Sequence, residues 1–307
     1  MLIKTLEDLR QEAIKIGPKI ISVANPAEEE IFEALQEAYQ QKMIRGFFVG
    51  DRTIIAPLAE KFGLNTTDFE IIHVEGGEAE AARAAAKLVH DKRAHFLMKG
   101  TVSTAYFLKA VLDKDIGLRS SVTRLLSHVA IFEVAGYDRL LFLTDAAFNI
   151  KPSLEEKAAL IDNAVRVAQA LGIAKPKVAC VTAIEKVNPK MQSTVEAAEL
   201  AKMAHDGRFP EAYVEGPFGL DNAVDEQAAE IKGVKGDVAG KADIILAPDM
   251  DSANVIYKSL GILTRCPAAA IVVGTDAPVV LTSRADSART KLLSLALGAM
   301  IARHYYS

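Results

Sequence analysis

Short apolar runs rich in β-branched residues alternate with helix-length amphipathic segments along the whole chain. Because the runs are apolar throughout, each predicts a strand that is buried on both faces of a sheet. Strands separated by helices favour a mostly parallel sheet with helices on both faces. The predicted strands cover residues 19–24, 46–50, 69–75, 95–100, 129–134, 140–145, 177–182, 212–216, 243–248, 269–274 and 278–283.

The amphipathic segments predict helices over 27–43, 78–91, 154–171, 190–206 and 286–303. Ser153 and Glu156 have the spacing of a capping box, and Pro152 precedes them, so a helix is expected to begin here. We place a hinge between two domains at 148–152. Since the last helix is expected to return to the first domain, the predicted domains are 1–148 with 285–307, and 149–284.

The composition is typical of a globular protein with two domains. The chain has 307 residues, of which 50% are hydrophobic and 25% charged. A net charge of −4 gives no general attraction to nucleic acid or to anionic membranes. The N-terminal segment carries acids and lacks the apolar core of a signal peptide, and no run of about 18 uncharged apolar residues predicts a membrane span. We expect a cytoplasmic protein.

Two cysteines, Cys180 and Cys266, lie in apolar runs. This setting favours buried free thiols, with a disulfide between them as the alternative. Neither the cysteines nor the six scattered histidines have the spacing of a zinc site, so we expect no metal.

Phosphate-binding motifs matter next, since many α/β proteins bind nucleotides. Neither a P-loop nor a dinucleotide-binding glycine pattern follows any predicted strand. In MKGTVST (98–104), Gly100 permits a tight turn, and Lys99 and Thr101 are placed to hold an anion where a helix begins. The alternative is a capped turn beside a solvated lysine.

Two arginines and several hydroxyls lie ahead of the strand predicted at 129–134. Arg119 and Arg124 have the planar fork that suits phosphate, and Ser127 and His128 follow them. The alternatives are a solvated basic surface and a histidine within the core.

Polar residues also follow two later strands. Asp221 and Asn222 come after the strand at 212–216, and Asn254 and Lys258 share one face of the helix after 243–248. Ligands of open α/β sheets bind beyond the carboxyl ends of the strands, where both loops are expected.

The segment VLTSRADS (280–287) joins the last predicted strand to the last helix. An acid in the first turn of a helix is stabilising by about 0.3–1 kcal/mol, so Asp286 has an ordinary explanation there. Arg284 has none, because a cation is unfavourable at that end of a helix. An anion bound beside Ser283 and Arg284 accounts for the arginine, which favours an anion site over a simple cap.

Together these motifs resemble the phosphate acetyltransferase and phosphate butyryltransferase family. The resemblance extends from about HFLMKG (95–100) to SRADS (283–287), and the butyryl branch matches best, through LSHVAIFEV, TDAAFNIKP, EKVNPKM, EGPFGLDNAV, VAGKADIILAPDMDSANVIYKSL and VVLTSRADS. It implies the reaction acyl-CoA + phosphate ⇌ acyl phosphate + CoA, without a tightly bound cofactor. It also implies a homo-oligomer with a two-domain α/β/α fold, similar to isocitrate and isopropylmalate dehydrogenases, and an active site in the cleft between domains.

The family's Ser-Arg pair falls on Ser283 and Arg284. In acetyl-type relatives an aspartate further along the same helix is proposed as the general base, whereas the corresponding residues here, SARTKL, contain no acid. Asp286 is the nearest carboxylate, and we group it with the pair as catalytic. The residues expected to bind substrate and CoA are Lys99, Gly100, Thr101, Arg119, Arg124, Ser127, His128, Asp221, Asn222, Asn254 and Lys258.

Three alternatives share parts of this pattern. A phosphate acetyltransferase would use the same mechanism with different room for the acyl chain. An NAD(P)- and metal-dependent hydroxyacid dehydrogenase of the same fold would need clustered aspartates and a nucleotide loop. A CoA- or acyl-phosphate-binding protein would need no catalytic groups. Since no activated nucleophile is evident, we expect direct transfer in a ternary complex without a covalent acyl-enzyme.

Overall fold

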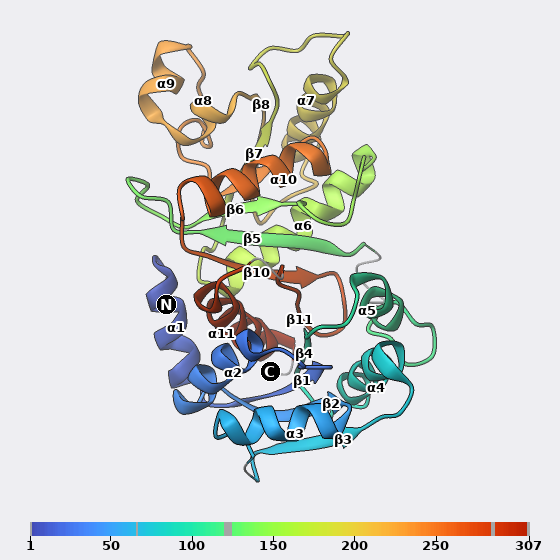
Figure 1. Cartoon of the computed structure of the whole chain (residues 1–307). Helices are drawn as coiled ribbons and strands as arrows, with labels where there is room; N and C mark the ends of the chain where they lie inside the picture. The colour runs from blue at the N-terminus through green and yellow to red at the C-terminus, as the bar shows by residue number, and fades with distance from the viewer. Residues whose placement is uncertain (1, 66, 120–124, 284–285, 306–307) are drawn as a thin grey trace. The chain divides into compact units, whose positions relative to one another are not determined.

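The computed structural model describes residues 2–65, 67–119, 125–283 and 286–305 (Figure 1). The chain divides into two compact units, which we call unit 1 (Met1–Leu6 and Leu125–Ala268) and unit 2 (Glu7–Arg124 and Ala269–Ser307). These boundaries fall earlier in the chain than the predicted ones at 148 and 284. Strand pairing explains the first difference, because it groups β5 (Ser127–Phe132) and β6 (Leu141–Thr144) with the later strands of unit 1.

The strands of unit 2 pair in the order β3-β2-β1-β4-β11-β10. The pairs from β3 to β11 are parallel, and β10 is antiparallel to β11. Every residue of β10 and β11 is buried, as their continuous apolar runs predict. The bounds are α1 (Leu6–Lys15), β1 (Lys19–Ala24), β2 (Ile44–Gly50), β3 (Phe69–His73), β4 (Phe96–Lys99), β10 (Ala268–Val273) and β11 (Val279–Val280).

Helices cover both faces of these strands. α2 (Glu29–Gln40) contacts α3 (Arg52–Lys61) and α11 (Ala288–Tyr305), whereas α4 (Gly77–His90) contacts α5 (Thr104–Val111) and the strands β1, β2 and β4. Right-handed crossovers account for this arrangement. The connections that lead outward from β1 to β3 place their helices on one face, and the return to β4 places α4 on the other.

The last helix, α11, is buried over most of its length. Residues 291–302 are all buried, which is typical of a helix that is apolar on every side. A Cβ on Gly298 would lie 2.9 Å from side-chain atoms of both Phe96 and Val280, so the helix packs closely against β4 and β11. This contact fixes the start of α11 close to the carboxyl ends of those two strands.

The strands of unit 1 pair in the order β5-β6-β9-β7-β8. The pairs from β6 to β8 are parallel, and β5 is antiparallel to β6. Helices α6 and α10 both contact β6. The remaining bounds are α6 (Leu154–Ala170), β7 (Lys177–Val181), α7 (Gln192–His205), β8 (Tyr213–Phe218), α8 (Leu220–Val224), α9 (Glu226–Ile231), β9 (Ile244–Leu246), α10 (Met250–Lys258) and a π-helical turn (Ser259–Leu263).

Several predictions from the apolar pattern are confirmed. Each of the predicted strand runs overlaps one of the 11 strands found among the described residues, and the fold class is α/β with mostly parallel strands. The capping box also forms, since Ser153 Oγ accepts from the Glu156 amide at 3.3 Å and the Glu156 carboxylate accepts from the Ser153 amide at 2.7 Å. Among the described residues, no helix combines the length and the apolar content that crossing a membrane requires.

Candidate active site

The strand order of unit 2 reverses at β1. The chain leads outward from β1 to β2 and β3, and then returns to β4 on the other side of β1. At such a switch point the loops after two neighbouring parallel strands turn to opposite faces, which leaves room for a ligand at their carboxyl ends. Asn25 follows β1 and Gly100 follows β4, so both residues lie at this edge.

Gly100 and Thr101 bind the β4 loop to the end of β1. The Gly100 amide donates to the Ala24 carbonyl at 2.9 Å, and a Cβ on Gly100 would lie 2.4 Å from the carbonyl oxygens of Ala24 and Asn25. The Thr101 hydroxyl donates to the Asn25 carbonyl at 2.8 Å and accepts from Asn25 Nδ2 at 2.8 Å. Only glycine fits at position 100, and Asn25, which sequence analysis does not single out, completes the turn.

Lys99 ends β4 in a buried position. It is 7% exposed, and its Nζ donates to the Gly100 carbonyl at 3.3 Å. The interpretation of Lys99 as a solvated lysine is therefore wrong. α5 begins at Thr104, with Ser103 Oγ accepting from the Tyr106 amide at 3.3 Å, so the helix start predicted within 98–104 is confirmed.

A second loop reaches the same edge from β11. This strand runs parallel to β4, with Val280 opposite Met98. Each strand then leaves the sheet within a few residues, so Ser283 lies at the same carboxyl edge as Gly100. The sequence separation between these residues is large, and parallel pairing is what brings them to one edge.

Ser283 and Asp286 form a tight turn between β11 and α11. The Ser283 amide donates to Asp286 Oδ2 at 2.6 Å, and the Asp286 amide donates to the Ser283 carbonyl at 3.1 Å. The helix is capped by Ser287, whose Oγ accepts from the Thr290 amide at 3.1 Å. The expectation that Asp286 lies in the first turn of the helix is therefore wrong, because α11 begins at Ala288. Arg284 lies outside the described residues.

Lys291, which sequence analysis also does not single out, lies beside this turn. It is the fourth residue of α11 and is 5% exposed, and its Nζ donates to the Asp286 carbonyl at 2.5 Å. Long helical side chains point toward the N-terminus of their helix, which carries the ammonium back over the turn. The available signal in the sequence was a lysine inside an otherwise apolar stretch that no acid accompanies.

In unit 1, the predicted residues Ser127 and His128 are buried in β5. Asn163 Nδ2 donates to Ser127 Oγ at 2.6 Å, and the His128 ring lies edge-on to Tyr257 with 5.6 Å between centroids. The His128 amide donates to Asp145 Oδ1 at 3.2 Å. These contacts favour the alternative of a histidine within the core.

Asp145, which follows β6, organises this end of unit 1. Its buried carboxylate accepts from the amides of Ala147 (3.0 Å), Phe148 (3.3 Å) and Asn149 (3.2 Å), as well as from the Asn149 side chain. A buried charge is tolerated when several donors satisfy it. Asp145 therefore shapes the loop that follows it.

The predicted pair Asn254 and Lys258 lies on α10, close to the same loop. Asn254 Nδ2 donates to the Ala146 carbonyl at 3.1 Å, and Lys258 Nζ lies 5.4 Å from the centroid of the Tyr257 ring. Since Tyr257 also contacts His128, the structure brings Asn254, Lys258 and His128 together.

Asp221 and Asn222 lie apart from that group. They follow β8, and two strands separate β8 from β6. Asp221 forms an ion pair with Lys232 at 2.9 Å, and the hydrogen bond from Lys232 lowers the pKa of Asp221. Asn222 is buried, and its Nδ2 lies 3.5 Å from Glu185 Oε2. These contacts account for Asp221, whereas Asn222 Oδ1 is buried and has no hydrogen-bond partner among the described residues.

Arg119 lies in unit 2, near the end of its first segment. Its backbone forms an isolated antiparallel bridge with Thr275, and its Nε donates to the Leu112 carbonyl at 2.8 Å. The residue is exposed, so its guanidinium is accessible to a ligand. Arg124 lies outside the described residues.

Both cysteines are free thiols, as predicted. Burial raises the pKa of Cys180 to about 12, and burial together with the charge of Glu133 raises the pKa of Cys266. Such thiols carry little thiolate near neutral pH, so neither has the character of an activated nucleophile. In the described part of the chain, no three or more His, Cys, Asp or Glu side chains are grouped to hold a metal ion.

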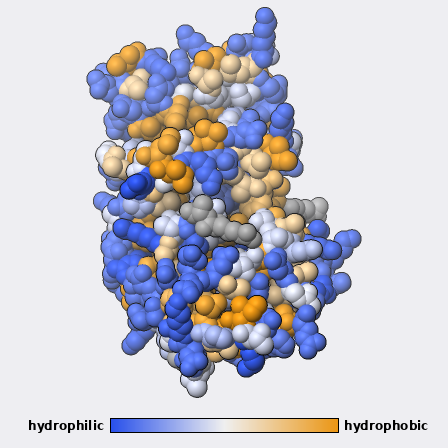
Figure 2. Space-filling view, viewed as in Figure 1, coloured by the Kyte–Doolittle hydropathy of each residue, from blue (hydrophilic) through white to orange (hydrophobic). Residues whose placement is uncertain are grey.

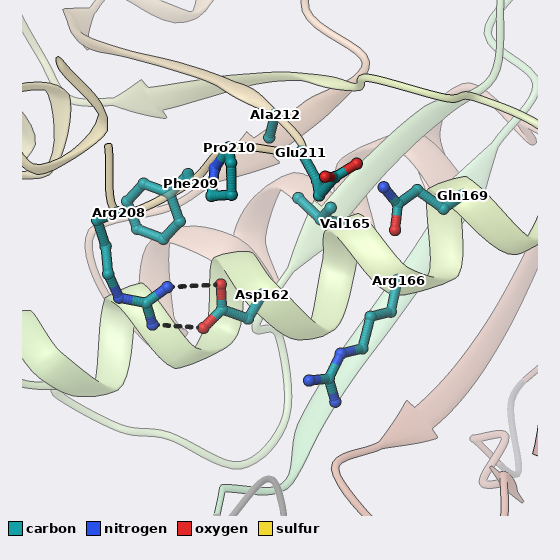
Figure 3. A pocket seen from close by; sticks show the side chains of 9 residues that line it. All are labelled: Asp162, Val165, Arg166, Gln169, Arg208, Phe209, Pro210, Glu211 and Ala212. Carbon is teal, nitrogen blue, oxygen red and sulfur yellow. Dashed lines mark hydrogen bonds and ion pairs between the residues drawn. The ribbon is translucent and has the colours of Figure 1, made fainter. Parts of the chain in front are cut away.

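A cavity of about 280 Å³ lies elsewhere in unit 1 (Figure 3). Its walls come from α6 and from residues 208–212. Asp162 and Arg208 form a two-pronged ion pair at its side, with distances of 2.5 and 3.1 Å. None of the predicted site residues that the structure describes lines this cavity, so we take the carboxyl edge of unit 2 as the candidate active site.

A known protein family matches most of this chain. Residues 78–299 match the family model described as phosphate acetyl/butaryl transferase. The chain belongs to this family. It is 46% identical over 299 residues to the phosphate butyryltransferase of Clostridium beijerinckii, which covers 97% of this chain and 98% of the relative. It is 40% identical over 286 residues to a phosphate acetyltransferase of Rhizobium meliloti, covering 93% and 90%.

A solved structure agrees with these relatives. The crystal structure of a branched-chain phosphotransacylase from Enterococcus faecalis matches with a TM-score of 0.82 and 34% identity, over 92% of this chain and 99% of that one. The family resemblance drawn from the motifs is thus confirmed, as is the two-domain α/β/α fold class. The protein is an enzyme of the acyltransferase class.

Proposed function

We propose that this enzyme moves a short acyl group, butyryl in the first place, between coenzyme A and inorganic phosphate: acyl-CoA + phosphate ⇌ acyl phosphate + CoA. The observation that carries the proposal is the 46% identity to a phosphate butyryltransferase over almost the whole chain. The carboxyl edge of β1, β4 and β11 supports it, because the buried ammonium of Lys99 and the turn that begins at Ser283 both lie there. Such an edge suits a dianionic substrate.

The reaction needs few protein groups. A phosphate oxygen attacks the thioester carbonyl carbon, the C–S bond breaks, and the CoA thiolate leaves and takes the proton of hydrogen phosphate. Negative charge develops on the carbonyl oxygen and then on sulfur. We assign Ser283 and Arg284 to stabilise this charge, and comparable preorganised donors are worth roughly 3–4 kcal/mol each.

The reverse reaction needs a base for the CoA thiol, which is only a few per cent ionised at neutral pH. We assign this role to Asp286. The Ser283 amide holds its Oδ2 at 2.6 Å, which fixes the carboxylate at the turn where the Ser-Arg pair begins.

Direct transfer in a ternary complex remains our proposed route. Its support is the raised pKa of both thiols, since a covalent acyl-enzyme would need a nucleophile that is ionised near neutral pH. We expect Cys180→Ala and Cys266→Ala to keep most activity. Trapping a labelled acyl group on either cysteine would contradict this route.

The other predicted residues are given roles by their position. We assign Lys99, Gly100 and Thr101 to binding inorganic phosphate at the carboxyl edge of unit 2. We assign the cations Arg119, Arg124 and Lys258 to binding the phosphates of CoA. The residues assigned to shaping the substrate loops are Ser127, His128, Asp221, Asn222 and Asn254.

We further propose that the enzyme works in the cytoplasm as a homo-oligomer. Figure 2 shows apolar side chains over α10 and the turn after it, where Val255, Ile262 and Leu263 are exposed. Exposed apolar patches of this kind are typical of subunit contacts. Sedimentation of wild type and Leu263→Asp would test it, and a wild-type monomer would exclude it.

The decisive experiment measures phosphate-dependent release of CoA thiol from acetyl-, butyryl- and isobutyryl-CoA. We expect the fastest release with four-carbon substrates and a loss of about 10²–10³-fold in kcat for Arg284→Ala. Arg289→Ala, which removes an exposed arginine near the start of α11, is the matched control and should retain activity. No phosphate-dependent release with any substrate would exclude the proposed reaction.

Phosphate acetyltransferase is the second candidate. The 40% identity to the Rhizobium meliloti enzyme supports it, and the mechanism would be unchanged. Fastest release from acetyl-CoA in the same experiment would decide for it.

A further inference from the structure

We propose that the Lys291 ammonium binds the phosphate substrate, at the turn formed by Ser283 and Asp286. The inference rests on the proposed function and adds a binding residue to it. Three observations carry it: the burial of the ammonium, the lack of a carboxylate partner among the described residues, and its position at the beginning of a long helix.

Among the residues that the structure describes, Lys291 is a buried cation without a neutralising acid. Among residues 2–65, 67–119, 125–283 and 286–305, its Nζ has one hydrogen-bond acceptor, the Asp286 carbonyl at 2.5 Å, and no carboxylate oxygen within 4.0 Å. An ammonium has three donors, so one carbonyl leaves most of its bonding capacity unused. Burying a charge costs several kcal/mol unless a counter-charge and further bonds offset it.

Another lysine of the same chain shows the ordinary solution. Lys157 is 4% exposed, as deeply buried as Lys291, and it pairs with the Glu196 carboxylate between α6 and α7. Two lysines of equal burial thus differ in one respect, the presence of an acid. The charge of Lys157 is balanced within the fold, and that of Lys291 calls for a partner from outside it.

The N-terminus of α11 makes the buried charge of Lys291 still less favourable. Lys291 is the fourth residue of α11, which has 18 residues, and its ammonium reaches back to Asp286, ahead of the helix. The N-terminus of a helix carries a partial positive charge, so a cation there is unfavourable and an anion is favourable. A phosphate at the turn would be attracted by both the ammonium and the helix end.

The proposed ligand chemistry is a phosphate dianion, and two sources can supply it: inorganic phosphate and the phosphates of CoA. We commit to inorganic phosphate because the ammonium lies at the turn that carries Ser283, which we assign to the reacting carbonyl. Titration of the protein with inorganic phosphate and, separately, with CoA distinguishes the two sources.

Two substitutions separate charge from structure. Lys291→Gln removes the charge but keeps an N–H donor for the Asp286 carbonyl, whereas Lys291→Met removes both. We expect each to raise the phosphate KM and the Kd for inorganic phosphate at least tenfold, and to leave the acyl-CoA KM within twofold. Arg289→Met, an exposed cation two residues away, is the control and should leave both KM values within twofold.

The outcomes are distinct. If Lys291→Gln keeps the wild-type phosphate KM and Kd, Lys291 serves only to hold the Asp286 carbonyl, and the inference is wrong. If the CoA affinity falls and the phosphate affinity does not, the cation serves CoA, and the inference is also wrong. If wild type turns over no acyl-CoA, the proposed function fails, and direct phosphate titration of wild type and Lys291→Gln still tests the site. Should Lys291→Met not fold, Lys291→Gln carries the test alone.

Discussion

The carboxyl edges of the two units are built from opposite charges. In unit 1, an aspartate lies within three residues of the end of β6, β8 and β9, namely Asp145, Asp221 and Asp249. Backbone amides bind Asp145 and Asp249, and Lys232 pairs with Asp221. In unit 2, the corresponding edge holds the buried lysines Lys99 and Lys291.

The difference lies in how the charge is balanced, not only in its sign. Every one of those aspartates is matched by a donor from its own loop or a nearby helix, so the acids of unit 1 stabilise the fold. Lys291 is matched by a single carbonyl of the described residues, and we propose that the substrate phosphate balances its charge. A polar strand end is thus a candidate site when its charge is left unbalanced, and a structural turn when it is not.

Among the substitutions that compare the two units, the largest effect on kcat/KM should come from Gly100→Ala at the carboxyl edge of unit 2. In Gly100→Ala the new Cβ would lie 2.4 Å from the Ala24 and Asn25 carbonyl oxygens, so the β1 and β4 loops must separate. We expect kcat/KM to fall about 100-fold, since an error of about 1 Å in position costs that much. Stability should fall by about 1–3 kcal/mol.

Gly261→Ala is the matched control, because a Cβ there meets nothing within 4 Å. Steady-state kinetics and urea unfolding of both variants provide the measurement. If Gly100→Ala has wild-type kinetics, the active site does not lie at this edge.

A smaller effect, on stability and not on activity, is expected from replacing Asp145 in unit 1. Asp145→Asn keeps the shape but removes the charge that accepts from the Ala147, Phe148 and Asn149 amides. We expect a loss of about 1.5–3 kcal/mol in the free energy of unfolding, typical of hydrogen bonds to a charged group, with kcat within a few-fold of wild type.

Asp251→Asn, an exposed acid on α10, should change stability by less than about 0.5 kcal/mol. Chemical denaturation at neutral pH compares the two variants. A large loss of kcat for Asp145→Asn without a loss of stability would give this acid a chemical role and reverse the contrast between the units.

The smallest effect concerns the thiol in the core of unit 1. Burial raises the pKa of Cys180 to about 12, whereas an unfolded thiol titrates near about 8.5. Above the lower value the unfolded state loses its proton while the folded state keeps it, so stability falls as pH rises toward the higher one. The slope is at most about 1.4 kcal/mol per pH unit.

Urea unfolding of wild type and Cys180→Ala at several pH values above 8 gives the comparison. The Ala variant should show the shallower decline, although it begins from a lower stability because of the lost volume. Tyr137, whose pKa burial also raises to about 12, is present in both proteins and cancels. Equal slopes would mean that Cys180 is not protected from ionisation.

The sequence pattern was sufficient to predict the elements that depend on interactions between residues close together in the chain. Continuous apolar runs located the strands, and the Ser153–Glu156 box located the start of α6, because both depend on neighbours in sequence. The start of α11 was misplaced because Asp286 and Ser287 are both good capping residues. Tertiary contacts decide between them: the Asp286 carboxylate binds the Ser283 amide, and Ser287 is left to cap.

Residues whose meaning depends on distant partners were not predictable in the same way. Lys291 looks like one polar residue in an apolar helix until its burial and its missing acid are known. Asn25 gains its role from Thr101, far along the chain. Ser127 looked like part of a phosphate-binding cluster, but its hydroxyl accepts from Asn163 on α6.

The division of unit 2 into two segments has a consequence for how the protein is made. Residues 7–124 leave the ribosome before most of unit 1, whereas β11 and α11, which complete the edge beside β4, are made after unit 1. Unit 1 draws almost all of its residues from the intervening segment, and domains generally fold as their residues emerge. Unit 1 can therefore fold while the carboxyl edge of unit 2 still lacks β11. We expect activity to appear only after β11 and α11 have been made, so that a chain without them does not bind substrate.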